Sequence, residues 1–143
     1  MKKLKIFLLL LVLLCISKTN VYAASGSLST SAGTVYVGDS FTVSVNVFSV
    51  AAWNVHTSVS GPVTGCIINQ ADATADAMDT NKTFNATCTA TSEGTITIRL
   101  NGDVTSAVDG NAVALYGSRN VSVISRPAPS NQNNNNNGQN NNN

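Results

Sequence analysis

The stretch Phe41-Thr42-Val43-Ser44-Val45-Asn46-Val47 places apolar residues at its odd positions and polar residues at its even positions. Successive side chains of a β-strand point to opposite faces of the sheet. The alternation therefore indicates a strand with one face against a core and the other in solvent. This stretch alone predicts a sheet that covers a hydrophobic core on one side.

The same period of two recurs along the chain. It is found in residues 53–60, 84–90, 95–100 and 121–123. Turn-forming residues separate these segments, at positions 37–39, 60–62, 93–94, 101–103 and 109–111. Short alternating strands joined by Gly-, Asp- and Asn-containing turns are typical of antiparallel sandwiches. We predict an all-β protein with a single antiparallel Ig-like β-sandwich over residues 24–125.

The segment before the sandwich, residues 1–23, has the features of a secretory signal peptide. Lysines at the start precede an unbroken apolar run from Ile6 to Ile16, which is too short to cross a membrane. The small side chain of Ala23 predicts cleavage between Ala23 and Ala24. We expect a secreted, extracellular or surface-associated mature protein without a membrane span.

Cleavage also changes the charge of the chain. It removes four of the eight basic residues and leaves four against seven acidic ones, a net charge of −3. A mature chain this weakly charged lacks the basic surface of proteins that bind nucleic acid. After Ser125 the composition changes, and residues 131–143 are almost entirely Asn. Such a segment has no apolar side chains to bury, so residues 126–143 are predicted to be a disordered Pro- and Asn-rich linker or tail of a longer protein or a truncated relative.

The mature chain has two cysteines, Cys66 and Cys88. Export favours a disulfide between them. A loop with this separation gives roughly 3 kcal/mol of stabilisation in the chain-entropy account. Two alternatives are a pair of redox-active thiols and a zinc site. The spacing is not Cys-x-x-Cys, and His56 is the one His that could complete a zinc site.

Residues 70–81 break the alternation. Asp72, Asp76 and Asp79 are spaced four and three apart, which would place them on one face of a short helix. Three carboxylates on one face are candidate calcium ligands. Their spacing differs from that of a helix-loop-helix calcium loop, and an alternative is a solvated acidic face. We therefore assign no metal or other cofactor to the chain and keep these residues as calcium candidates.

Trp53 is the candidate ligand-binding residue. It shares its parity with Val55 and Val59, which predicts a core position, whereas a sugar-stacking platform needs an exposed ring. His56 falls on the polar face of the same strand and is the only His available as a base. We find no nucleophile elbow, phosphate loop or paired acid and base, so the chain is not expected to be an enzyme.

The stretch Thr34-Val35-Tyr36-Val37-Gly38-Asp39-Ser40-Phe41-Thr42-Val43-Ser44-Val45 resembles the opening of Ig-like and cohesin-like modules in exported surface proteins of low-GC Gram-positive bacteria. Residues 93–98, 101–105 and 121–123 are similar to later parts of such repeats, so the resemblance covers about residues 25–125. It implies a non-catalytic structural or adhesive module of a bacterial surface protein. The alternative is a carbohydrate-binding or calcium-dependent, cohesin-like partner-binding domain. The partner is then a protein or a glycan at the cell surface.

Overall fold

The computed structural model describes residues 23–73 and 80–129. These residues form eight strands. The strands are β1 (Ser25–Thr30), β2 (Thr34–Tyr36), β3 (Ser40–Ser60), β4 (Val63–Gly65), β5 (Asn69–Asp72), β6 (Thr80–Ala90), β7 (Gly94–Ser106) and β8 (Ala112–Ile124).

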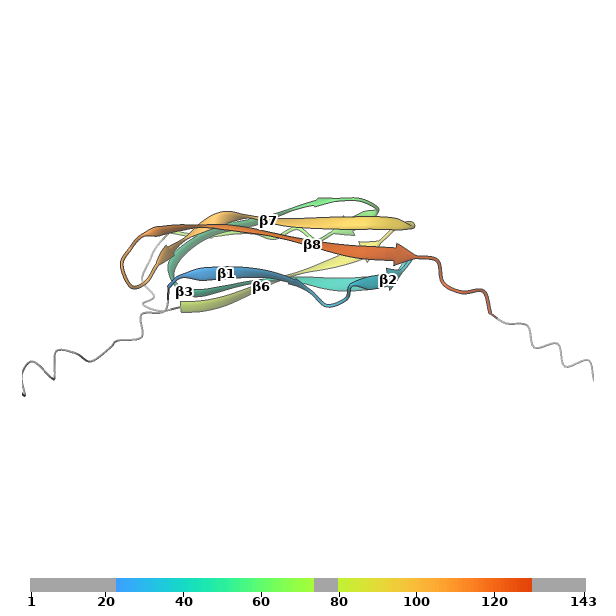
Figure 1. The fold of residues 1–143 in the computed structure, drawn as a ribbon, viewed down its shortest axis with the longest axis horizontal. Helices are drawn as coiled ribbons and strands as arrows, with labels where there is room; N and C mark the ends of the chain where they lie inside the picture. The colour runs from blue at the N-terminus through green and yellow to red at the C-terminus, as the bar shows by residue number, and fades with distance from the viewer. Residues whose placement is uncertain (1–22, 74–79, 130–143) are drawn as a thin grey trace, which may run out of the picture.

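The strands form two layers that face each other across one core (Figure 1). The first layer, called sheet I, contains β1, the first half of β3, β6 and β4. The second, sheet II, contains β5, the second half of β3, β7, β8 and β2. All pairs are antiparallel except β2 with β8. The predicted all-β antiparallel sandwich is confirmed, in the form of one curled sheet folded over on itself.

Strand β3 joins the two layers. The sequence pattern indicated two strands, at 41–47 and 53–60, and the structure contains one strand from Ser40 to Ser60. Its pairing shifts register between Val47 and Val50, and again between Val50 and Ala52. Ser49 lies within the first of these shifts and has a left-handed φ of 54°. Bulges of this kind bend a strand and increase its twist, which carries β3 from one sheet to the other.

The core fills the space between the layers. The inward residues of the 41–47 stretch are all buried, as the alternation predicts. The largest fully buried side chains are Ile96, Ile98, Leu100, Val43, Val45, Val47, Val50, Val55, Val104, Val121, Cys66 and Cys88. Because these side chains come from both layers, the hydrophobic effect holds the two sheets together.

Two local predictions are wrong. Residues 101–103 form no turn, because they lie within β7 and pair with both β3 and β8. Gly102 adopts a φ of 139° there, and a Cβ at this position would lie 2.0 Å from the Asn54 carbonyl oxygen. The predicted helix from residue 70 is also wrong at its start, because Gln70 to Asp72 belong to β5 and pair with β3. An edge position beside β3 satisfies the backbone of this polar segment better than an isolated turn of helix.

Candidate functional site

The Cys66–Cys88 disulfide is present in the structure and joins the end of β4 to β6. The two Cα atoms are 4.7 Å apart, and both residues are fully buried. A hydrogen bond from the Cys66 N–H to the Thr87 carbonyl, 3.0 Å long, lies beside the bridge. Cys66 has a left-handed φ of 64°, which turns the chain away from β6 toward the edge of β3.

Thr57 anchors the segment after the bridge. Its buried hydroxyl donates to the Cys66 carbonyl (2.7 Å) and accepts from the Ile68 N–H (2.9 Å). The alternation of β3 placed Thr57 on the inward face, and the side chain is indeed buried. The disulfide and this hydroxyl form a structural staple. With both sulfur atoms bonded, neither cysteine is a thiol nucleophile or a metal ligand.

Trp53 lies on β3 opposite Asp72 of β5, and its ring faces β6. Its ring packs against the core and lies 5.9 Å from the Phe84 ring, tilted by 48°. The Lys82 ammonium lies 5.9 Å from the Trp53 ring centroid. The predicted inward position of Trp53 is therefore confirmed. Its side chain is only partly buried, because the neighbouring strand β5 is short and covers little of the ring. Its role as a ligand platform stays a prediction.

The three calcium candidates are not brought together by anything the structure describes. Asp72 lies at the end of β5, opposite Trp53 in the β3–β5 pair. Asp76 and Asp79 lie outside the described residues. Within 23–73 and 80–129, no group of three or more His, Cys, Asp or Glu side chains is close enough to hold a metal ion.

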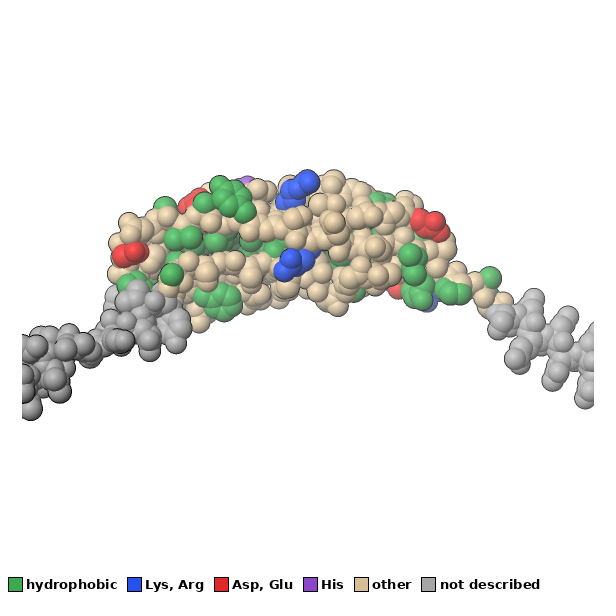
Figure 2. Space-filling model, viewed as in Figure 1, with side chains coloured by type: hydrophobic (Ala, Val, Ile, Leu, Met, Phe, Trp, Pro, Cys, Tyr) green, Lys and Arg blue, Asp and Glu red, His purple; other side chains and the backbone are tan. Residues whose placement is uncertain are grey.

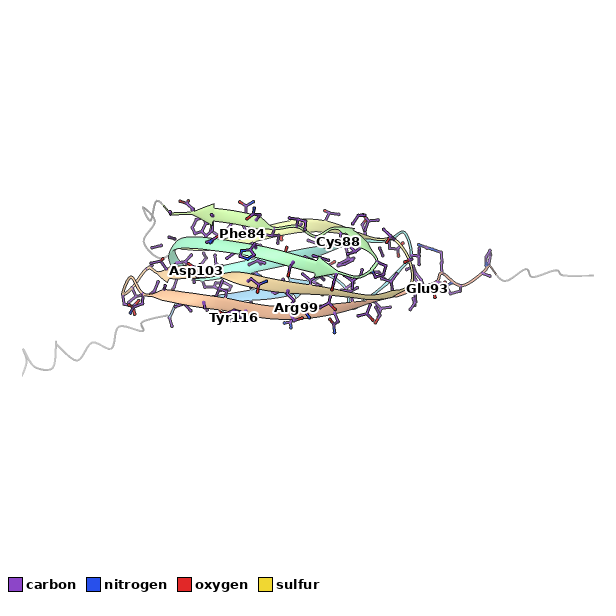
Figure 3. All side chains as sticks on the ribbon, turned by 90° about the horizontal axis from the view of Figure 1, so that it is seen from above. Phe84, Cys88, Glu93, Arg99, Asp103 and Tyr116 are labelled. Atoms are coloured by element: carbon purple, nitrogen blue, oxygen red, sulfur yellow. A yellow bond between two sulfur atoms is a disulfide. The ribbon has the colours of Figure 1, made fainter. Side chains whose placement is uncertain are left out.

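The outward face of sheet II has the most varied chemistry. Asn69, His56, Asn101 and Tyr116 lie opposite one another in a row across β5, β3, β7 and β8. The Tyr116 side chain is 80% exposed and reaches into solvent. Figure 3, seen from above, shows Tyr116 toward one edge of the domain and Phe84 toward the other, with Arg99 and Asp103 on β7, the neighbour of the strand that carries Tyr116. We call the row formed by Asn69, His56, Asn101 and Tyr116 the Tyr116 row. The alternation in the sequence predicted that His56 lies on the outward face. It did not predict that Tyr116 lies in the same row across the sheet.

The outward face of sheet I is uncharged. Its polar positions carry hydroxyl and amide side chains, and several bond across the strands: Ser44 donates to Asn85 (2.7 Å), Thr83 donates to Asn46 (2.7 Å), and Ser40 lies 3.1 Å from Thr89. The polar positions on this face include Ser25, Ser27, Ser29, Ser40, Thr42, Ser44, Asn46, Thr83, Asn85, Thr87 and Thr89. Phe48, opposite Ser25 and 45% exposed, adds one large apolar side chain to the same face. Figure 2 shows that Lys, Arg, Asp and Glu side chains are also sparse on the side of the molecule in view.

The structure describes the residues next to both predicted boundaries of the domain, Ala24 at its start and Arg126 after its end. Ala24, which follows the predicted cleavage bond, is buried next to β1. Residues 1–22 and 130–143 lie outside the described residues, so the leader and most of the tail stay predictions. Arg126 forms an ion pair with Asp39 (2.6 Å) and lies over the Tyr36 ring, so domain contacts reach into the segment predicted as tail. No helix in the described part of the chain is long and apolar enough to cross a membrane.

The turn between β7 and β8 contains a carboxyl with a lowered pKa, that of Asp109. The Asp109 carboxyl is hydrogen-bonded by the Ser106 hydroxyl and by both the backbone N–H and the side-chain amide of Asn111. These hydrogen bonds lower its pKa from the ordinary value of 3.8. These groups close the hairpin and lie apart from the Tyr116 row. The lowered pKa is a feature of turn geometry, because hydrogen bonds from neighbouring donors favour the charged carboxylate.

Fold and surface thus define a disulfide-stapled, two-layer β domain in which the outward face of sheet I lacks charged side chains. No family model matches the chain. No curated protein matches it either. Among solved structures, the chain is similar to a CARDB domain from Pyrococcus furiosus, crystallised in complex with di-metal ions. The two share 19% sequence identity with a TM-score of 0.46, over 71% of this chain and 87% of that one.

Proposed function

We propose that this domain is a non-catalytic structural or adhesive module of an exported protein. The observation that carries the proposal is the outward face of sheet I, where most side chains are hydroxyls and amides and several of them bond to one another across the strands. Such a face is well hydrated and has no charge with which to attract or orient an ionic substrate. The leader and the Cys66–Cys88 disulfide support an oxidising location outside the cell.

A second candidate function, binding of a neutral glycan, is favoured by the Tyr116 row. An exposed tyrosine ring can stack on a sugar face, while neighbouring amides supply hydrogen bonds to hydroxyls. Asn101 lies beside Tyr116 in this arrangement, and His56 lies on the far side of Asn101, one strand further away. The row runs across four neighbouring strands, so a linear chain of sugars fits it better than a single small molecule.

A glycan array separates the two functions. The full chain is applied with and without calcium, together with Tyr116→Ala, Trp53→Ala and, as a matched control, Val108→Ala at an exposed apolar site in the turn between β7 and β8. A structural module gives no specific signal in any form. Binding lost only in Tyr116→Ala supports the glycan-binding function instead. Binding that requires Trp53 or calcium contradicts the structural proposal and restores the platform or calcium hypothesis.

The export part of the proposal has its own measurement. Mass spectrometry of the secreted product should find Ala24 at its N-terminus and both cysteine thiols absent. Free Cys66 and Cys88 thiols in the exported chain would contradict the assigned location.

A further inference from the structure

Charged side chains are distributed unevenly over the strands that the structure describes. Arg99 and Asp103 lie on β7, which has a strand on either side, and both point outward. Asp72, Lys82 and Arg119 lie on β5, β6 and β8, at positions that have a strand on one side only. These three occupy core-facing positions, where the alternation predicts apolar side chains. In the described sheets, a charge in the core-facing row is therefore a feature of the edges.

Lys82 shows how such a charge is accommodated. It lies opposite Val47, a fully buried residue of β3, so its side chain starts on the inner face of sheet I. Its ammonium lies 5.9 Å from the Trp53 ring centroid, at the rim of the core, and the residue is exposed. In the described part of the chain, residues 81–86 of β6 pair with β3 alone, because β4 joins the other side at Cys88. Lys82 thus stands beside a free strand edge.

Arg119 occupies the equivalent place on β8. It lies opposite Ile98, which is fully buried in β7, yet Arg119 itself is exposed. Its Nη1 atom donates to the Ser118 carbonyl oxygen at 3.2 Å, which holds the guanidinium along the backbone of β8. Among the described strands, β7 alone pairs with residues 112–121 of β8, and β2 joins the other side at Ser122. Strand β1 packs against β8 from the other layer without pairing with it.

The other edges are short or polar. Strands β2, β4 and β5 have three or four residues each, which is short for a strand that recruits a partner. Strand β1 has six residues, and Leu28 is its only large apolar side chain. The longer free stretches, on β6 and β8, each carry a core-facing cation.

We propose that Lys82 and Arg119 prevent the free edges of β6 and β8 from pairing with a second copy of the chain. A second copy paired at either edge would continue the sheet, and its other layer would cover the core-facing cation and bury it without a partner. Both residues are cations, so β6–β6, β8–β8 and β6–β8 contacts between copies all bring like charges together. The inference goes beyond the proposed function, because it concerns how the module stays a single copy and involves no ligand.

The position of the two edges gives this protection its importance. Figure 3 shows Phe84, which lies on β6, toward one edge of the domain and Tyr116, which lies on β8, toward the other. Without the cations, each copy would therefore offer two pairing edges on opposite sides. Contacts of this kind do not close on themselves, so association would continue past a dimer.

The test compares the oligomeric state of four proteins that all keep the disulfide and the tail. They are the wild-type chain from Ala24 onward, the double variant Lys82→Val, Arg119→Val, the double variant Lys82→Glu, Arg119→Glu and the control Arg99→Val. Valine restores the alternation at both edges. The control removes a cation from β7, which is paired on both sides. Sedimentation velocity over a series of concentrations measures the mass of each protein.

We expect monomers for the wild type, the glutamate variant and the control. The glutamate variant stays monomeric because like negative charges repel as like positive charges do. The valine variant should form dimers and larger assemblies at a concentration at least about tenfold lower than the other three proteins. A valine variant that stays monomeric overturns the proposal, and so does association of the wild type or of the control at the same concentration as the valine variant.

Hydrogen exchange locates the contact in the assemblies. Amides of residues 81–86 and 112–121 should exchange more slowly than in the monomer, because N–H groups at the free edges gain partners. Slower exchange confined to other residues overturns the proposal. Urea unfolding at low concentration checks the fold, since valine in a core-facing row should keep or raise the midpoint. Association together with loss of the cooperative transition would show that the cations serve folding, and this result also overturns the proposal.

Discussion

The Thr57 hydroxyl bonds the backbone on both sides of Ile67. It donates to the Cys66 carbonyl at 2.7 Å and accepts from the Ile68 N–H at 2.9 Å. The Thr57 backbone N–H donates to the Ile68 carbonyl at 2.9 Å, so one residue of β3 holds the segment between β4 and β5 by three hydrogen bonds. This buried contact positions Cys66 for its disulfide with Cys88.

Replacement of Thr57 by Val keeps the shape of the side chain and removes its hydroxyl. Two backbone groups of the buried segment then lose a partner, and we expect a loss of about 2 kcal/mol in the free energy of unfolding. Thr57→Ser keeps the hydroxyl and should lose much less. Urea unfolding of the two variants measures the difference. Equal stability of the valine and wild-type proteins would show that the segment is held without the hydroxyl.

Removal of the disulfide tests the other half of the staple. The double variant Cys66→Ala, Cys88→Ala frees a loop of sequence separation 22, and we expect a loss of roughly 3 kcal/mol. Unfolding is followed with and without a reductant. The wild-type protein should become less stable on reduction, whereas the double variant should not respond. A reductant effect of the same size in the double variant would refute the assignment of this stabilisation to the bridge.

Gly102 allows β7 to approach β3 closely. An added Cβ would lie 2.0 Å from the Asn54 carbonyl oxygen, and the φ of 139° is unfavourable for any other residue. Gly102→Ala should therefore destabilise the domain by more than about 2 kcal/mol. Gly33→Ala is the matched control, because an added Cβ there meets nothing within 4 Å. Thermal unfolding of both variants should show a large shift for Gly102 alone.

Gly102 also shows where sequence reasoning reached its limit. Asn-Gly-Asp is turn chemistry, and the same residues suit a mid-strand position where two backbones come close. Local sequence does not distinguish these cases, because the second depends on β3, about fifty residues earlier in the chain. The inward positions of Val43, Val45 and Val55, in contrast, follow from alternation alone and are buried as predicted.

The candidate site was predicted less completely than the core. Alternation gave the outward position of His56, but the row that joins it to Asn101 and Tyr116 depends on the register of three strands. The partial burial of Trp53 depends in turn on how far β5 and β6 extend over its ring. Register and strand length are set by tertiary pairing, which a single sequence specifies only weakly.

The hairpin between β7 and β8 should respond to acid through Asp109. Hydrogen bonds from Ser106 and Asn111 lower the pKa of this carboxyl below its ordinary value of 3.8. A group with a lowered folded-state pKa stabilises the protein above its unfolded-state pKa, and this contribution is lost as the pH falls through the folded-state pKa. Asp109→Asn keeps the shape and does not titrate. The stability difference between wild type and this variant should therefore be constant near neutral pH and shrink below about pH 4. Urea unfolding of both proteins at neutral pH and at about pH 3 measures it. Because other carboxylates titrate equally in both proteins, a difference that stays constant across this range would show that the hairpin does not depend on the Asp109 charge.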